Sequence, residues 1–363
     1  MKTFLIAEIG VNHDGDIEKA KRLILAAKAS GADAAKFQTF KAEHLATISS
    51  PKAKYQEAST GIGTQYEMLK ALELSHQQFV ELKLFSDSIG IEFMSTPFDL
   101  DSLYFLVNTL QVKRIKLSSG DLTNLPLMYE VGKFKIPTII STGGATFHEI
   151  DNAVIAWTLG RKNIMPTRQD FQKSESERIE GFDKFEMREL SILQCTTQYP
   201  ASSANLNLNV IKSYLTRYPS KIGYSDHSIG YEASLAAVAL GASVIEKHIT
   251  ESTADLGPDH SASMEIHDFK NLVDSIRMLE IALGGEIKYP TEDERQTISI
   301  ARKSLFAARD ILKDQIIEAV DLVALRPAGG LDPSYYWDFV GKSAVQNISK
   351  GGSIDEASIS RLL

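Results

Sequence analysis

Cysteine is nearly absent from this sequence: Cys195 is the one example in 363 residues, so no disulfide can form within the chain. A chain without disulfides is typical of a reducing compartment, and we expect the cytoplasm. No apolar run approaches the roughly 18 residues that a membrane helix requires. The first strand-like run, FLIAEIG, follows Met1 closely, without the regions of a signal peptide. We therefore expect a cytoplasmic protein with no membrane partner.

Positive charge is also in deficit. The chain has 39 Lys and Arg residues against 47 Asp and Glu residues, which gives a net charge of −8. Nucleic-acid binding depends on a basic surface that neutralises phosphates, so we expect no nucleic-acid partner. The same balance leaves room for a local basic pocket that binds a small anion. A hydrophobic content of 43% is enough for an ordinary buried core.

A dinucleotide-binding glycine pattern is missing too. The first strand-like run continues as EIGVNHDGD, which does not match GxGxxG. What the sequence has instead is about eight alternations of an apolar strand-like run with a helix-like stretch. This pattern predicts an α/β fold, a (β/α)8 TIM barrel over residues 1–283. The doubly wound open sheet is the alternative.

Two segments depart from this alternation. Residues 161–188 are highly charged and lack periodicity, which predicts an exposed insertion, disordered in preference to partner-binding. Residues 284–299 are polar and predict a linker. Residues 300–363 hold short strand-like runs and Gly-Gly turns, and we expect a small β-rich domain there.

Polar side chains stand at the ends of successive strand-like runs. A TIM barrel collects the carboxyl ends of its strands on one face, where its active site lies. Stability alone gives no reason to place acids, lysines and histidines there together. The sequence therefore predicts an active site that includes Glu8, Lys36, Gln38, Thr96, Lys116, Ser119, Ser141, Thr197, His227, Glu246 and His248.

His227 and His248 close two strand-like runs that are separated by one helix-like stretch. On neighbouring parallel strands they would lie side by side and could bind a divalent metal, with substrate, water or a carboxylate completing the shell. Hydrogen-bonded structural histidines are an equal alternative. Glu246 would face the same side of its strand as His248. It could be a metal ligand, an orienting group or a salt-bridge partner.

Lys36 and Lys116 end apolar strands, where a charged side chain needs a partner. A phosphate or carboxylate would supply one, with Ser119, Ser141 and Ser225 as further donors. Internal pairing with Glu8 or Asp226 is one alternative, and a Schiff-base lysine is another.

Four further residues have weaker signals. Glu8 and Asp259 could act in acid–base chemistry or accept hydrogen bonds from a sugar, although Asp259 alone reads as a solvated turn acid. Arg326 alone reads as a surface arginine. Cys195 lacks an evident base, and we expect it to be inert.

Nine motifs resemble the sialic acid (nonulosonic acid) synthase family in order along the chain. The resemblance continues through RKSLFAARDI and LRPAGG, and its main exception is the segment 161–188. The matching motifs are AEIGVNHDGD, GADAAKFQTF, FMSTPFD, KLSSGD, IISTGG, QCTTQYP, GYSDHSIG, VIEKHIT and GPDHSASM.

The resemblance implies a TIM barrel followed by an antifreeze-like (SAF) domain, in a homodimer whose tail domains each cap the partner's active site. It implies an enzyme that condenses phosphoenolpyruvate with an N-acylated mannosamine-type sugar and releases phosphate. A divalent metal, manganese or magnesium, would be held by the residues matching His227 and His248.

The resemblance also implies a role for each residue that matches a family motif. The predicted catalytic set is Glu8, Lys36, Lys116, His227, His248 and Asp259. Lys36, Thr96 and Lys116 would hold the phosphoenolpyruvate carboxylate, and Ser119, Ser141 and Ser225 the phosphate. The sugar would face Glu8, Gln38, Tyr199 and Asp259, and the partner's Arg326 would reach its N-acyl oxygen. Asp121 stands where glutamate is common, and Thr197 where asparagine can bind phosphate.

The segment KFQTF lacks the histidines that flank the glutamine in typical N-acetylneuraminate synthases, and Gln194 replaces a frequent histidine. The phenylalanine-containing strand end, Thr197 before Gln198-Tyr199-Pro200, and Tyr224 before Ser225 resemble the N,N′-diacetyllegionaminate synthase branch. The alternatives are an N-acetylneuraminate synthase, a catalytically inactive sugar-binding protein, and a Schiff-base aldolase that uses Lys116.

Overall fold

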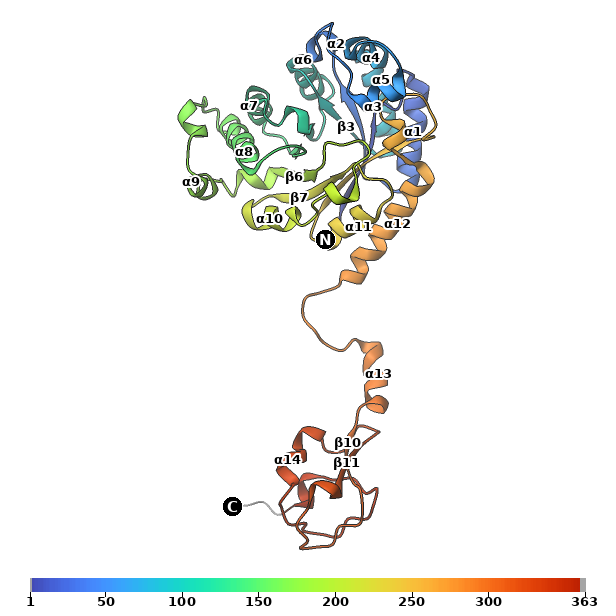
Figure 1. Cartoon of the computed structure of the whole chain (residues 1–363), viewed down its shortest axis with the longest axis vertical. Helices are drawn as coiled ribbons and strands as arrows, with labels where there is room; N and C mark the ends of the chain where they lie inside the picture. The colour runs from blue at the N-terminus through green and yellow to red at the C-terminus, as the bar shows by residue number, and fades with distance from the viewer. Residues whose placement is uncertain (1, 360–363) are drawn as a thin grey trace. The chain divides into compact units, whose positions relative to one another are not determined.

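The computed structural model describes residues 2–359 of the chain, apart from the side chains of residues 54, 55 and 58. The chain divides into two compact units, Met1–Gly284 and Gly285–Leu363. Figure 1 shows strands surrounded by helices in the first unit and a smaller set of elements in the second. Among the helices of residues 2–359, none combines the length and apolar content that crossing a bilayer requires.

Eight parallel strands form the centre of the first unit, as the alternation predicts. They are β1 (Phe4–Gly10), β2 (Ala34–Thr39), β3 (Glu92–Pro97), β4 (Ile115–Leu117), β5 (Thr138–Ser141), β6 (Leu190–Cys195), β7 (Lys221–Asp226) and β8 (Val244–Thr250). Hydrogen-bonded neighbours follow the order β3-β2-β1-β8-β7-β6-β5-β4, and β3 and β4 at its two ends lie next to each other. The sheet is therefore a barrel, to which β9 (Met264–Glu265) adds beside β8.

Helices cover the outside of this barrel (Figure 1). Short helices α2 (Ala42–Leu45), α3 (Lys54–Thr60) and α4 (Gln65–Leu72) lie in the connection that follows β2. A π-helical turn, η1 (Phe105–Thr109), extends α6. The helices that follow the strands are α1 (Ile17–Ser30), α5 (His76–Ile89), α6 (Leu100–Tyr104), α7 (Leu125–Lys133), α8 (Phe147–Arg161), α10 (Val210–Arg217), α11 (Glu232–Ala239) and α12 (Ile266–Leu283).

Local sequence sets the ends of the clearest helices. The side chain of Asp16 accepts a hydrogen bond from the Glu18 N–H at the start of α1, and Gly31 ends that helix in the left-handed region at φ 89°. Ser75 and Gly90 do the same for α5. These are the start and stop residues that the sequence predicts.

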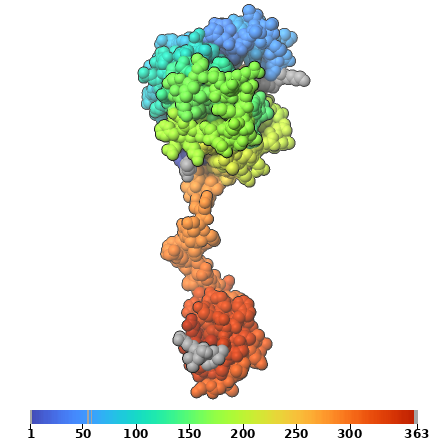
Figure 2. Space-filling model, turned by 90° about the vertical axis from the view of Figure 1, so that its left-hand side faces the viewer, coloured from blue at the N-terminus to red at the C-terminus, as the bar shows by residue number. Residues whose placement is uncertain are grey.

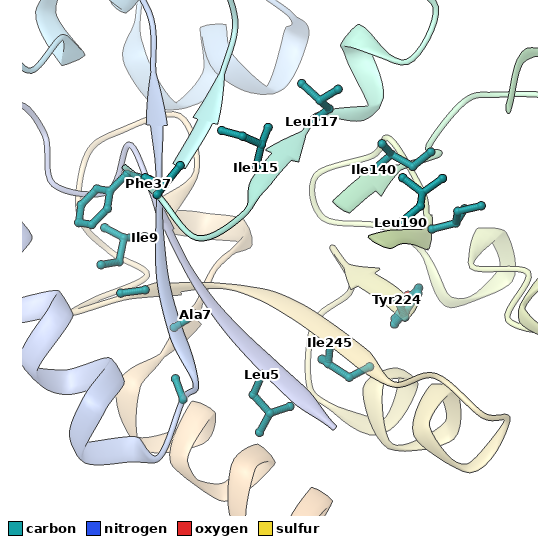
Figure 3. Packing of buried hydrophobic residues seen from close by; sticks show 14 of the residues in the cluster. Leu5, Ala7, Ile9, Phe37, Ile115, Leu117, Ile140, Leu190, Tyr224 and Ile245 are labelled. Carbon is teal, nitrogen blue, oxygen red and sulfur yellow. The ribbon is translucent and has the colours of Figure 1, made fainter. Parts of the chain in front are cut away.

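Side chains alternate between the two faces of every strand, because successive residues of a strand point in opposite directions. Outward residues such as Leu5, Ala7 and Ile9 of β1 pack with those of other strands against the helices (Figure 3). The inward residues at the amino ends of the strands form a separate apolar layer of Ile6, Ala34, Met94, Ile139, Leu193 and Val244. Gly223 completes it, since a Cβ there would lie 2.4 Å from Leu193 and 2.5 Å from the Val244 carbonyl oxygen.

The insertion 161–188 is ordered, and the expectation of disorder was wrong. It contains α9 (Glu175–Glu180), and Phe182 and Met187 join the main core. Buried Asp151 of α8 anchors it: Arg178 Nε donates to Asp151 at 3.1 Å, and Arg217 binds the same carboxylate at 2.6 Å. Figure 2 shows this region, in green, packed onto the first unit.

The second unit contains α13 (Glu292–Ala301), within and beyond the predicted linker, and α14 (Tyr336–Phe339). Strands β10 (Ser304–Ala307) and β11 (Leu322–Leu325) pair antiparallel. Its core is formed by Leu305, Ala307, Ile311, Ile317, Leu322, Phe339, Ala344, Ile348 and Ile354.

Candidate active site

Four buried charged side chains form a chain of ion pairs across the inside of the barrel, directly above its apolar layer. Lys36 Nζ lies 2.6 Å from Glu8 Oε2 and 3.6 Å from Glu246 Oε2. Lys116 Nζ lies 3.3 Å from Glu246 Oε1. Two carboxylates and two ammonium groups therefore balance each other's charge in a buried space, while Glu8 Oε2 and Glu246 Oε2 have no hydrogen-bond partner among the described residues.

The sequence left open whether Lys36 and Lys116 pair with Glu8 or Asp226. Both lysines do pair with buried acids, but only one of these two acids is involved. Glu8 is a partner of Lys36, whereas Asp226 points to the outside of the barrel and pairs with Lys247 at 3.2 Å. Ser225 Oγ donates a 2.8 Å hydrogen bond to Glu246. Glu246 is thus a partner of lysines and a serine in this structure.

Burial raises the pKa of both acids, but the net shifts of the two pKa values are opposite. It raises the pKa of Glu8 to about 7, because Lys36 offsets only part of the cost of ionisation. Burial also disfavours ionised Glu246, but Lys116 and Lys36 outweigh it and hold its pKa at about 2. Glu246 is therefore ionised at neutral pH, and Glu8 is poised to exchange a proton.

Two histidines lie at the same end of the barrel. Their ring centroids are 5.6 Å apart, and both are buried. Burial lowers the pKa of His227 to about 4 and lowers that of His248 well below its usual value. Both imidazoles are therefore neutral at pH 7, the form that binds metals.

The hydrogen bonds of these histidines fit a metal site. His227 Nδ1 lies 2.7 Å from the Thr196 carbonyl oxygen, so Nδ1 carries the proton and Nε2 is the acceptor nitrogen, which here accepts from the Tyr199 hydroxyl and which a metal would take over. Nε2 lies 3.1 Å from the Tyr199 hydroxyl. His248 Nδ1 is buried without a hydrogen-bond partner among the described residues, 3.8 Å from Asp259 Oδ2. Two neutral nitrogens and a nearby carboxylate suit a divalent cation.

Two other groups of close histidine and carboxylate donors occur within residues 2–359: Asp14, Asp255 and His260, and His44, Asp99 and Asp101. Neither contains His227 or His248. In the first group the Lys19 ammonium already lies 2.7 Å from each carboxylate.

A small cavity of about 50 Å³ lies among these charged side chains, at the carboxyl ends of the barrel strands. Twelve predicted residues line it: Glu8, Lys36, Gln38, Thr96, Lys116, Ser119, Ser141, Tyr199, Ser225, His227, Glu246 and His248. A wider cavity of about 970 Å³ lies beside it, and Cys195 lines both. The ion-paired lysines and glutamates and the two histidines all line the small cavity.

Four predicted residues lie off this lining. Thr197 lines the wider cavity and lies 3.4 Å from Ser119 Oγ. Asp121 accepts a 2.9 Å hydrogen bond from Ser118. Asp259 approaches His248 from the loop after β8, and burial raises its pKa to about 6. Arg326 is exposed in the second unit, where its Nε donates to the Ala301 carbonyl oxygen at 2.8 Å.

Sequence reasoning missed Phe98 and Ser118, which also line the small cavity together with Cys195. Phe98 and Ser118 each follow the end of a strand, so the rule that found their neighbours could have found them. Cys195 Sγ lies 3.7 Å from His227 Nδ1, so the expectation that no base is near it was wrong. Burial nevertheless raises the pKa of Cys195 to about 12, so its thiol stays protonated.

The sequence of this chain is similar to that of a known enzyme family. The NeuB family model matches residues 23–288. An N,N′-diacetyllegionaminic acid synthase of Legionella pneumophila is 41% identical over 98% of this chain and 94% of its own. The human N-acetylneuraminate-9-phosphate synthase is 33% identical over 97% of this chain and 91% of its own.

A solved structure agrees. The N-acetylneuraminic acid synthetase of Leptospira borgpetersenii superposes with a TM-score of 0.66 at 30% identity, over 82% of this chain and 90% of that one. The chain therefore belongs to the NeuB family and is a nonulosonic acid synthase.

Proposed function

We propose that this enzyme condenses phosphoenolpyruvate with 2,4-diacetamido-2,4,6-trideoxymannose to form N,N′-diacetyllegionaminate and phosphate. The observation that carries the reaction is the buried Glu8–Lys36–Glu246–Lys116 chain beside two neutral histidines. The choice of sugar draws on the two N,N′-diacetyllegionaminic acid synthases, 41% and 40% identical to this chain over 98% of its length.

Phosphoenolpyruvate offers a carboxylate and a phosphate to the two lysines. Lys36 and Lys116 are held ready by Glu8 and Glu246, so binding exchanges one set of charge pairs for another. Ser141 Oγ is buried and has no hydrogen-bond partner among the side chains and backbone that the structure describes, so it is available to a phosphate oxygen. Ser119 and Ser225 flank the same cavity.

The reaction forms a carbon–carbon bond and a carbon–oxygen bond to water, and it breaks the carbon–oxygen bond to phosphate. The alkene carbon of phosphoenolpyruvate attacks the aldehyde carbon of the open-chain sugar, and the aldehyde oxygen takes up a proton. Water adds to the resulting cationic carbon and loses a proton, and phosphate then leaves as the new hydroxyl becomes a carbonyl group. Glu8, with a pKa of about 7, is placed to accept the proton of that water. Gln38 Nε2 donates to Glu8 Oε1 at 3.3 Å and orients it.

His227 and His248 would hold the divalent metal, manganese or magnesium, with Asp259 close by. When bound, this metal would act as a Lewis acid that polarises the sugar aldehyde. Tyr199, stacked on His227 with ring centroids 4.1 Å apart, limits the free space on that side. Phe98 adds an apolar wall, which suits a 6-deoxy sugar.

A substrate panel tests this proposal. The enzyme is incubated with phosphoenolpyruvate, Mn²⁺ and either the diacetamido sugar or N-acetylmannosamine, and the product is identified by mass. We expect the higher kcat/KM for the diacetamido sugar. A preference for N-acetylmannosamine would instead identify an N-acetylneuraminate synthase. Sugar binding without turnover across the panel would identify a binding protein.

The Schiff-base alternative is tested in the same material. Borohydride reduction in the presence of pyruvate should leave Lys116 unmodified. Burial lowers the pKa of Lys116, but the Glu246 carboxylate 3.3 Å away opposes this and favours the ammonium form. An adduct on Lys116 in the mass spectrum would favour the aldolase.

A further inference from the structure

Two loops that follow neighbouring strands are fastened to each other beside the site. Residues 11–16 follow β1 and residues 251–263 follow β8, and these strands pair so that Glu8 lies opposite His248. The second loop carries Asp259, while the first carries none of the predicted site residues.

His260 links the two loops from a fully buried position. Its Nε2 lies 3.0 Å from Asp14 Oδ1, and its Nδ1 lies 2.7 Å from the Thr250 hydroxyl. With a partner on each ring nitrogen, the imidazole is held in one orientation. Asp259 is the preceding residue.

Lys19 of α1 adds a second link. Its ammonium lies 2.7 Å from Asp14 Oδ2 and 2.7 Å from Asp255 Oδ2. The three donors Asp14, Asp255 and His260 resemble a cation site, and Lys19 is the cation that occupies it. We call the five residues Asp14, Lys19, Thr250, Asp255 and His260 the loop clamp.

The backbone is shaped around this cluster. Asp14 adopts φ 54°, a left-handed conformation that aspartate tolerates better than most residues. Gly257 leaves room for the imidazole, since a Cβ there would lie 2.7 Å from His260 Cδ2 and 3.1 Å from Asp14 Oδ1.

A third connection reaches Asp259 itself. Ser263 Oγ donates to the Asp259 carbonyl oxygen at 2.7 Å, and Asn12 Nδ2 donates to that same hydroxyl at 2.8 Å. The backbone that follows Asp259 is therefore tied to the loop after β1, and Asp255 before it reaches that loop through Lys19. The Asp259 carboxylate then lies 3.8 Å from His248 Nδ1.

We propose that the loop clamp is a positioning device that sets the Asp259 carboxylate against the sugar, rather than a second metal site. This proposal rests on the proposed function. It assigns all five clamp residues to the sugar half of the reaction, and it leaves phosphoenolpyruvate binding to the lysines inside the barrel.

The test uses full-length enzyme and two clamp variants with matched controls. Thr250→Val removes the hydroxyl that His260 contacts, and Thr250→Ser restores it. Asp14→Asn removes the charge that Lys19 binds, and asparagine tolerates the same φ. Arg22→Gln is the ion-pair control, because Arg22 also joins α1 to the second loop, through Glu251 at 2.8 Å, but does not touch the clamp.

We expect kcat/KM for the sugar to fall about 10- to 100-fold in Thr250→Val and Asp14→Asn, since a small misplacement of a reacting group has effects of this size. The KM for phosphoenolpyruvate should stay within about twofold. Thr250→Ser and Arg22→Gln should resemble the wild type. Equal losses for both substrates would overturn a positioning role.

Hydrogen exchange gives a readout that needs no turnover. Amides of residues 251–263 should exchange faster in Thr250→Val and Asp14→Asn than in Thr250→Ser and Arg22→Gln. Unchanged exchange there would overturn the clamp even if the enzyme is active. A wild-type enzyme that turns over neither sugar contradicts the proposed function instead, and the exchange data still decide the clamp.

Discussion

Glu8 shows how one buried position combines two demands at the scale of a residue. Its carboxylate must pair with Lys36 when the site is empty and handle a proton near pH 7 during the reaction. Burial raises its pKa while the lysine limits the rise, and together they give a value of about 7. Glu246, with two lysines and a serine, stays ionised instead.

The raised pKa of Glu8 predicts a pH-dependent stability that Glu8→Gln removes. An unfolded glutamate releases its proton near pH 4.5, and the folded one near pH 7. Between these values the folded state binds the extra proton, so the free energy of unfolding falls as pH rises from about 4.5 to 7, by on the order of 3 kcal/mol.

Urea unfolding of wild type and Glu8→Gln between pH 4.5 and 8 measures this. Asp259 is shifted in the same direction in both proteins, so the difference between the two curves isolates Glu8. A constant difference across the range would contradict the assignment of this pKa to Glu8.

The histidine pair predicts that metal binding depends on His248. His248→Ala removes one of the two neutral imidazoles, so Mn²⁺ affinity should fall at least about 10- to 100-fold, because changes to residues that only orient metal ligands already have effects of that size. Isothermal titration with Mn²⁺ at pH 7.5 measures it. His267→Ala, an exposed histidine on α12, is the control. Unchanged Mn²⁺ affinity in His248→Ala would place the metal elsewhere.

At the scale of elements, the sequence predicts what depends on near neighbours. The caps at Asp16, Gly31, Ser75 and Gly90 and the period-2 strands could all be read locally. The parallel pairing then brought strand ends together, so most of the site followed from the fold. Asp259 needed the resemblance, because a turn acid has no local signal of its own.

The insertion 161–188 could not be read this way. Its order depends on contacts with residues of α8 and α10. Arg178 of the insertion binds Asp151 of α8, and Glu175 of the insertion binds Arg217 of α10, which lies far from it in sequence. A charged segment without periodicity therefore looks disordered until its distant partners are known. Phe182 and Met187 are too few to signal a core by themselves.

Asp151 accordingly predicts a large effect. Asp151→Ala leaves Arg178 and Arg217 without their shared carboxylate in a buried place, which should lower the free energy of unfolding by about 3–5 kcal/mol. Thermal unfolding measures the loss, and limited proteolysis should cut within residues 162–188. Asp170→Ala, a partly exposed acid of the same insertion, should lose far less. Equal stability of the two variants would show that Asp151 is not the anchor.

At the scale of the whole molecule, the two units have different relations to the chemistry. Every residue on the lining of the small cavity belongs to the first unit. Arg326 is exposed in the second unit, and its recorded partner is a carbonyl oxygen of that unit. Nothing local in the sequence marks it as functional, so its role rests on the resemblance to the family.

We propose that Arg326 serves the barrel of a partner subunit in a homodimer, and complementation between two inactive variants tests this. His248→Ala and Arg326→Ala are co-expressed with different tags, and the mixed dimer is isolated. In that dimer only the Arg326→Ala chain keeps His248 in its barrel. This barrel receives an intact Arg326 only if the arginine comes from the other chain. We expect each homodimer to be nearly inactive and the mixed dimer to regain about half of the wild-type activity. An inactive mixed dimer would show that Arg326 acts within its own chain, and a monomeric mass by sedimentation would rule out the exchange altogether.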